Sequence, residues 1–195
     1  MTKGTGVTGF AVAGGRSQRM GSDKALLPWA GTTLLEHTLA RLRTVCAEVC
    51  ILSGAQIRYG DYGVPVHADV VQEAGPLGGV HAGLLSLRAP LGVFLAVDTP
   101  LIPPALLGAL AAAAGGFDAV VPVVGGRPEP LCAVYRGTCL APVQRRLEAG
   151  ERKMTSFWPD VRVRTMAEDE LAIFGDPAAM FRNLNTTEDY LRLRG

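Results

Sequence analysis

Short apolar runs recur along the chain and alternate with segments of helical periodicity. Several runs show no alternation of apolar and polar positions, a pattern typical of strands that are covered on both faces. The runs lie at residues 7–13, 49–53, 64–68, 93–97, 119–124, 131–135 and 161–164. We expect each of these runs to form a strand.

The intervening segments place apolar residues three or four positions apart, as on one face of a helix. They predict helices at residues 33–45, 79–87, 104–114 and 140–149. In the first of these, Thr33 and Glu36 have the spacing of a capping box, and Leu35, Leu39 and Leu42 share one face.

Strands that alternate with helices imply right-handed βαβ crossovers, and therefore a mainly parallel sheet between two helical layers. The predicted fold class is thus a doubly wound α/β domain. A length of 195 residues and a hydrophobic content of 48% predict one domain over residues 1–195. The stretch GGRPEP at residues 125–130 is either an irregular loop at the active face or a plain turn.

The charge balance excludes some classes of partner. With 19 basic and 18 acidic residues, the formal net charge is +1, so no strong overall field would attract nucleic acid or an anionic membrane. No run approaches the roughly 18 apolar residues that a membrane-spanning helix needs. The N-terminus carries no hydrophobic signal region, and we therefore expect a cytoplasmic protein.

The cysteines and histidines form no recognisable metal motif. The cysteine spacings of four and seven differ from the short paired spacings of zinc sites, which favours buried free thiols in a reducing compartment. The residues concerned are Cys46, Cys50, Cys132, Cys139, His37, His67 and His81.

The strongest chemical signal is the stretch AGGRSQRMGSDK at residues 13–24, which follows the first predicted strand. In open parallel sheets, ligands bind beyond the carboxyl ends of strands. Gly14 and Gly15 allow backbone N–H groups to converge on an oxyanion, and Arg19 and Lys24 add positive charge. The stretch has neither a Walker ending nor a GxGxxG pattern. It indicates a site for a nucleoside triphosphate, and the alternative is a surface loop with solvated basic residues.

Asp98 ends the apolar run FLAVD, where sheet geometry directs its carboxylate toward the same edge as the glycine-rich loop. A carboxylate at this position suits Mg²⁺, which takes few protein ligands and completes its shell with water and phosphate oxygens. The alternative is a cap for the helix that begins near Pro103. The spacing favours the metal-binding interpretation.

The stretch VAGGRSQRMGSDKALLPWAG resembles the signature LAGGxSxRMGxDKxxLPxxG of the molybdenum cofactor guanylyltransferases, with Val12 in place of the family's first leucine. The resemblance continues, in the expected order, through four further stretches. They are GPLGGVHAGL, FLAVDTPLIP, EPLCAVY and FRNLNTTEDY.

This resemblance implies a Rossmann-like nucleotidyltransferase fold and transfer of GMP from GTP to the terminal phosphate of molybdopterin, with Mg²⁺ as cofactor. It implies catalytic roles for Lys24, Arg19 and Asp98, and a metal contact for Asp98 and Asn185. Asn185 and Thr186 also look like the N-cap of a short helix that runs through Arg192. The nucleotide would contact residues that belong to four segments. They are Val12, Ala13, Gly14, Gly15, Lys24, Ser53, Asp69 and Asp98.

Some assignments differ from the family pattern or stay open. Ser53 replaces a frequent asparagine, so a base or ribose contact there is weakened or supplied by backbone, and Asp69 is alternatively an exposed turn residue. The acceptor pocket is expected among Arg127, Glu129, Pro130 and residues 150–158, where Arg152 and Lys153 either bind the pterin phosphate or end a helix.

Rival functions are a related nucleotidyltransferase with another nucleotide or acceptor, and a non-catalytic GTP sensor or partner-binding module that keeps the fold. The resemblance also suggests transient contacts with proteins that deliver and receive the cofactor.

Overall fold

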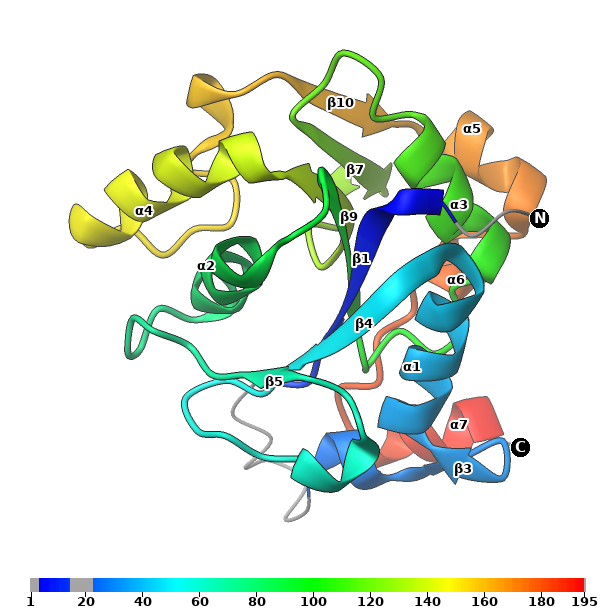
Figure 1. Ribbon diagram of the computed structural model, residues 1–195. Coiled ribbons are helices and arrows are strands. Elements are labelled where there is room, and N and C mark those ends of the chain that lie inside the picture. The colour runs from blue at the N-terminus through cyan, green and yellow to red at the C-terminus, as the bar shows by residue number, and fades with distance from the viewer. Residues whose placement is uncertain (1–3, 15–22, 195) are drawn as a thin grey trace.

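The computed structural model describes residues 4–14 and 23–194 (Figure 1). Its strands are β1 (Gly4–Val12), β2 (Pro28–Trp29), β3 (Thr32–Thr33), β4 (Cys46–Leu52), β5 (Val66–His67), β6 (Leu91–Ala96), β7 (Ala119–Val124), β8 (Arg127–Pro128), β9 (Cys132–Arg136) and β10 (Val163–Met166). Its α-helices are α1 (Leu34–Val45), α2 (Pro76–Ser86), α3 (Pro104–Ala112), α4 (Leu140–Glu148), α5 (Glu168–Leu171), α6 (Pro177–Met180) and α7 (Thr187–Arg194).

The main sheet is largely parallel, as the sequence predicts. Within the described residues its order is β10-β7-β9-β6-β1-β4-β5. The short strand β8 is outside this order and pairs with β7. β9 runs antiparallel to both of its neighbours, β6 and β7. The sheet therefore has a parallel part, β6-β1-β4-β5, and a mixed part that contains β9.

Helices cover both faces of the sheet, so the predicted doubly wound architecture is confirmed. Figure 1 shows α2 and α4 on one face and α1 and α3 on the other. Each face has its own buried apolar cluster, since most strand residues are covered on both sides. On the α2 side, Phe10 stacks on Phe94 with ring centroids 4.8 Å apart, and Tyr135 meets Phe94 edge-on at 5.4 Å.

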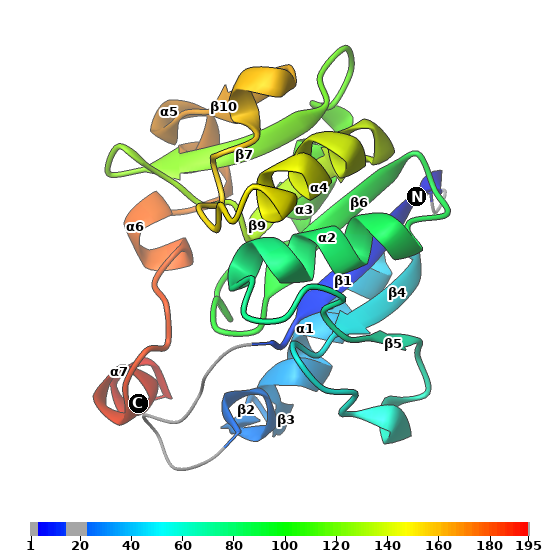
Figure 2. The ribbon, with the colours of Figure 1, turned by 90° about the vertical axis from the view of Figure 1, so that its left-hand side faces the viewer.

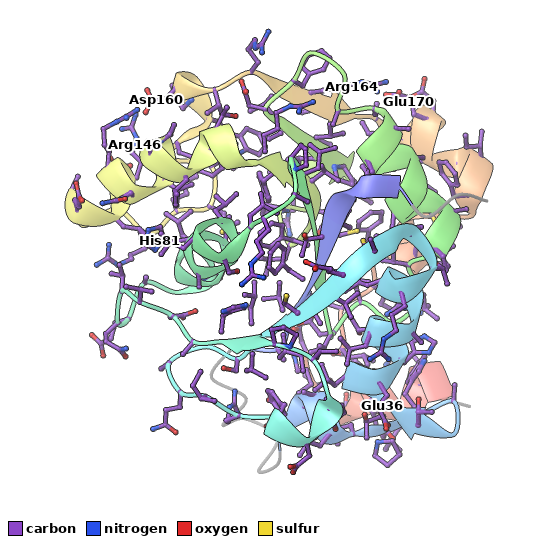
Figure 3. The ribbon with its side chains drawn as sticks, in the orientation of Figure 1. Glu36, His81, Arg146, Asp160, Arg164 and Glu170 are labelled. Atoms are coloured by element: carbon purple, nitrogen blue, oxygen red, sulfur yellow. The ribbon has the colours of Figure 1, made fainter. Side chains whose placement is uncertain are left out.

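The predicted start of α1 is confirmed. Thr33 is the N-cap, its hydroxyl accepts a hydrogen bond from the Glu36 N–H, and the Glu36 carboxylate accepts one from the Thr33 N–H. Figure 3 labels Glu36 at this end of α1. The leucines predicted to share a face, Leu35, Leu39 and Leu42, are all buried.

Several predicted boundaries are wrong. The strands expected at 7–13, 49–53 and 161–164 occupy Gly4–Val12, Cys46–Leu52 and Val163–Met166. The helix expected at 79–87 begins at Pro76, because proline at the first turn sacrifices no helical hydrogen bond and Gly75, at φ 61°, enters the helix in a backbone conformation that glycine tolerates. The strand expected at 64–68 has only two residues, Val66 and His67.

The stretch at 125–130 forms a plain turn followed by β8. Gly125 and Gly126 have φ of 57° and 70°, and they link β7 to β8 as a two-residue hairpin loop.

The C-terminal segment returns to the N-terminal part of the chain, at β2 and β3. In Figures 1 and 2 it passes from α6 to α7, which lies beside the hairpin of β2 and β3. Trp29, Leu34, Leu184 and Tyr190 form a small buried cluster there. The C-terminal segment is thereby fixed next to the residues that follow the glycine-rich loop.

Candidate active site

Lys24 and Asp98 meet at the carboxyl edge of the parallel strands. Lys24 Nζ lies 3.4 Å from Asp98 Oδ2, and the two side chains are 15% and 27% exposed. Asp98 comes two residues after β6, and Lys24 begins the 3-10 helix η2 (Lys24–Leu26). The prediction that the end of the basic loop and this carboxylate lie together is confirmed.

Asp23 fixes the position of Lys24. One oxygen of its carboxylate accepts a hydrogen bond from the Ala25 N–H at 3.1 Å and so caps η2. Its other oxygen accepts hydrogen bonds from Arg58 Nη1 at 2.9 Å and from the Tyr59 hydroxyl at 2.7 Å. Arg58 and Tyr59, in the segment after β4, therefore fix the position of Asp23, the residue that precedes Lys24.

Gly14 lies directly against the segment after β4. A Cβ at Gly14 would be 2.6 Å from the Gly54 nitrogen, so the close approach of the two backbones requires glycine. Val12 and Ala13 are buried, and the Ala13 N–H donates to Leu52 O at 2.9 Å. Nucleotide contacts by Val12, Ala13 and Gly14 stay predictions. Gly15 and Arg19 lie outside the described residues.

The polar groups of Ser53 bind other residues of the protein. Its hydroxyl donates to Gln56 O at 2.7 Å, its N–H donates to His67 O at 3.0 Å, and its carbonyl accepts from Arg58 Nη2 at 3.1 Å. The side chain is fully buried. These contacts shape the loop between β4 and β5, and a contact between Ser53 and the nucleotide stays a prediction.

Asp69 is a half-buried carboxylate that precedes α2 in the chain and lies beside its first turn, at Gly78. Its Oδ2 would be 3.3 Å from a Cβ at Gly78, and its Oδ1 is buried without a protein partner in the described structure. Burial raises the pKa of Asp69 because it penalises the charged form. A buried acceptor without a donor is costly, so an N–H or O–H of a ligand would stabilise it.

The antiparallel direction of β9 brings Glu129 to the same edge as Asp98. β6 and β9 pair Leu95 with Cys132, and the Ala96 N–H donates to Leu131 O at 2.9 Å. Burial, and secondly the negative charge of Asp98, raises the pKa of Glu129. Glu129 was expected only in the acceptor wall, since the sequence does not reveal the direction of β9.

A backbone hydrogen bond also brings the segment that contains Asn185 to Asp98. The Leu184 N–H donates to Asp98 O at 2.9 Å. The predicted N-cap is confirmed at Thr186, whose hydroxyl accepts from the Asp189 N–H at 3.0 Å, and the Asp189 carboxylate accepts from the Thr186 N–H. The metal contact of Asn185 stays a prediction.

Arg152 ends a helix, which is one of its two expected roles. Its Nη1 donates to Leu147 O in the last turn of α4 at 3.1 Å and to Glu151 O at 3.0 Å. Asp98 does not cap α3, whose N-cap is Pro103.

Other ion pairs lie in the upper part of the molecule in Figure 3, at α4 and at β10 with α5, away from α1. They join Arg146 to Asp160 at 2.9 Å and Arg164 to Glu170 at 2.7 Å. Their side chains are 28–39% exposed, so they contribute little to stability.

The donor set at the carboxyl edge suits a hard cation held by few protein ligands. Asp98 supplies a carboxylate, and Asn185, next to Leu184, carries an amide oxygen. Within residues 4–14 and 23–194, no group of three or more His, Cys, Asp or Glu residues has the arrangement of a metal site. Oxygen ligands in small number are the arrangement that Mg²⁺ accepts, since water and phosphate complete its shell.

In the part of the chain that the structure describes, no helix has the length and apolar character needed to cross a membrane.

The sequence comparisons agree on one family. The model of the MobA-like NTP transferase domain matches residues 9–163. A molybdenum cofactor guanylyltransferase of Serratia proteamaculans is 37% identical over 190 residues, which cover 95% of this chain and 93% of the relative. A molybdenum cofactor guanylyltransferase of Desulfosudis oleivorans is 32% identical over 188 residues, with 94% and 92% covered.

Solved structures show the same fold. The molybdopterin-guanine dinucleotide biosynthesis protein A of Archaeoglobus fulgidus superposes with a TM-score of 0.82 at 24% identity, covering 96% of each chain. The 2-C-methyl-D-erythritol 4-phosphate cytidylyltransferase of Thermus thermophilus gives a TM-score of 0.71 at 19% identity, covering 97% of each chain. The family model and the two guanylyltransferase relatives show that the chain belongs to the MobA-like NTP transferase family and is a nucleotidyltransferase.

Proposed function

We propose that this enzyme transfers GMP from GTP to the terminal phosphate of molybdopterin, and that pyrophosphate is the second product. The guanylyltransferase relatives support the substrates, since their similarity extends over nearly the whole chain. The observation that carries the chemistry is the 3.4 Å approach of Lys24 Nζ to Asp98 Oδ2 at the carboxyl edge. An ammonium and a carboxylate at this edge suit a polyphosphate with its cation.

In the proposed reaction, an oxygen of the acceptor phosphate forms a bond to the α-phosphorus of GTP. The bond between the α-phosphorus and the oxygen that bridges to the β-phosphate breaks, and pyrophosphate leaves with that electron pair. The attacking oxygen is already anionic at neutral pH, so no protein nucleophile is needed. The enzyme must align the two phosphates and reduce their repulsion.

Lys24 binds phosphate oxygen and balances the negative charge that develops on the leaving group. Arg19 has the same role in this proposal. Asp98 and Asn185 would hold Mg²⁺, which would supply charge neutralisation to the phosphates when bound. The backbone around Gly14 and Gly15 offers N–H groups to the phosphates.

Asp69 binds the nucleotide. Its buried Oδ1 has no protein donor in the described structure, and ribose hydroxyls and the guanine N–H groups are donors. Ser53 acts through the loop between β4 and β5, which its hydrogen bonds shape. We also propose that proteins that deliver and receive the cofactor contact the enzyme transiently.

A pyrophosphate-release assay tests the proposal. GTP, CTP, ATP and UTP are each supplied with Mg²⁺, with and without molybdopterin. We expect release with GTP only, and only when the acceptor is present. Release with CTP would assign the enzyme to cytidylyl transfer. If none of the four nucleotides gives pyrophosphate, a non-catalytic GTP sensor would be favoured.

A further inference from the structure

Helix α1 supplies two side-chain hydrogen-bond partners to the segment that follows Asp98. Arg41 Nη1 donates to Thr99 O at 3.1 Å and to Ile102 O at 2.8 Å. His37 Nε2 lies 3.1 Å from Pro100 O, which can only accept. His37 and Arg41 are four positions apart, and they therefore lie on the same side of the helix.

Arg41 is a buried cation, with 6% of the residue exposed. Burial lowers its pKa to about 10. Its Nε has no partner, and within the described residues no carboxylate forms an ion pair with it. A buried charge without a counter-charge is costly, and an apolar side chain of similar size would avoid this cost. Packing alone therefore does not explain why a charged residue is buried at position 41.

The reason lies in the backbone after β6. Four carbonyl groups between residues 98 and 102 receive hydrogen bonds from elsewhere in the fold. The Leu184 N–H donates to Asp98 O, and the side chains of Arg41 and His37 bind the carbonyls of Thr99, Pro100 and Ile102. This turn is therefore fixed from two sides.

The same helix is also connected to the Lys24 end of the site. The Leu34 N–H, at the first residue of α1, donates to Leu27 O at 3.0 Å, and Leu27 is the C-cap of η2. One regular helix therefore contacts the segments on both sides of the Lys24–Asp98 pair.

We propose that Arg41, together with His37, is a positioning residue that holds the turn after Asp98 against α1 and thereby sets the metal-binding geometry of the Asp98 carboxylate. The inference rests on the proposed function, because it takes Asp98 as a metal ligand. The planar guanidinium offers several N–H groups to two carbonyl oxygens at once, which a lysine ammonium does less well.

Mn²⁺ binding in the presence of GTP, without acceptor, tests this inference. Electron paramagnetic resonance of free Mn²⁺, compared with a protein-free sample that contains the same GTP and Mn²⁺, gives the affinity for wild type, Arg41→Met, Arg41→Lys and Arg136→Met. Circular dichroism melting confirms that each is folded. Residues that orient metal ligands typically change metal affinity by about 10- to 100-fold. We expect a loss in this range for Arg41→Met and a smaller loss for Arg41→Lys.

Arg136 is the matched control, since it also binds backbone carbonyls. Its Nε donates to Phe117 O at 2.9 Å and its Nη2 to Ala114 O at 2.8 Å, and it ends β9 at the opposite edge of the sheet. Arg136→Met should lower the melting temperature and leave Mn²⁺ affinity unchanged. Equal losses of affinity in Arg41→Met and Arg136→Met would show that Arg41 is merely structural and would overturn the inference.

A milder pair of variants serves if Arg41→Met does not fold. His37→Leu removes the contact to Pro100, and His37→Gln keeps a donor. Weaker Mn²⁺ binding in His37→Leu, with recovery in His37→Gln, supports the inference, whereas wild-type affinity in both overturns it. If wild type itself binds no Mn²⁺ with GTP, the proposed role of Asp98 fails, and the inference fails with it. If wild type binds Mn²⁺ and folded Arg41→Met binds it equally well, the inference alone fails.

Discussion

The parallel part of the sheet and its mixed part contribute to the site in opposite ways. In the parallel part, β1 and β6 end at one edge, so Lys24 and Asp98, which follow them, come together. In the mixed part, β9 runs the other way, so the residues before it, Glu129 to Leu131, lie at this edge. Arg136, which ends β9, binds Phe117 and Ala114 at the opposite edge. The candidate functional residues therefore follow the parallel strands in the chain and precede the antiparallel strand β9.

The largest effect that this comparison predicts is at Asp98. Asp98→Ala should abolish Mg²⁺-dependent GTP binding, because the carboxylate at the end of β6 is the charged ligand for the cation. A calorimetric titration of GTP with and without Mg²⁺ measures this. Asp160→Ala, which removes a partner of Arg146 away from the edge, should bind as wild type does. Retained binding in Asp98→Ala would contradict the metal site.

The next effect is at Lys24. Lys24→Ala should lower turnover about 10²-fold or more, by analogy with the loss of one preorganised donor at a developing charge. Steady-state pyrophosphate release measures turnover. Arg164→Ala, in the surface pair with Glu170, should leave turnover unchanged. Unchanged turnover in Lys24→Ala would refute its role.

Where α2 packs on the sheet, substitutions should change stability and not chemistry. A Cβ at Gly83 of α2 would lie 2.5 Å from Phe94 Cε1, and the Phe94 ring is confined by Phe10 and Tyr135. Gly83→Ala should therefore destabilise the fold by about 1–3 kcal/mol. Urea unfolding gives the free energy.

Gly108 of α3 is the control for Gly83. Its added Cβ would lie 3.6 Å from Val45 Cγ1, an ordinary contact, so Gly108→Ala should be neutral or stabilising through helix propensity. Equal destabilisation in both variants would show that steric overlap at Phe94 is not the cause.

The smallest effect is expected in the mixed part. The buried Tyr135 hydroxyl donates to Pro130 O at 2.8 Å, and this bond connects β9 to the turn that carries Glu129. Tyr135→Phe should lower the free energy of unfolding by about 1 kcal/mol, the usual net value of one hydrogen bond. Thermal unfolding and turnover are measured together. A loss of turnover larger than in Lys24→Ala would reverse the comparison between the two parts of the sheet.

The sequence predicts the parallel part better than the mixed part. The apolar runs at residues 7–13 and 93–97 predict two parallel strands. Because ligands bind at the carboxyl edge of such strands, the segments that follow the two runs, with Lys24 and Asp98, are expected at that edge. The direction of β9 depends on tertiary packing, and the short connection after β8 gives no periodic signal for it. For this reason Glu129 was expected only in the acceptor wall.

Arg41 shows a different limit. The pattern of residues 33–45 gives no role to Arg41, because its partners, Thr99 and Ile102, lie about sixty positions further along the chain. Likewise, the partners of the Ser53 hydroxyl appear only once the loop after β4 is folded. Local patterns therefore do not predict which carbonyl groups a buried polar side chain binds.

The four cysteines, Cys46, Cys50, Cys132 and Cys139, are buried free thiols, as the sequence predicts. Burial raises the pKa of each, to about 12 for Cys46, Cys132 and Cys139. At neutral pH very little thiolate is present in the folded enzyme. A cysteine introduced on the surface would thus react alone with a maleimide fluorophore or spin label, and nucleotide-dependent motion could be followed without removing any native thiol.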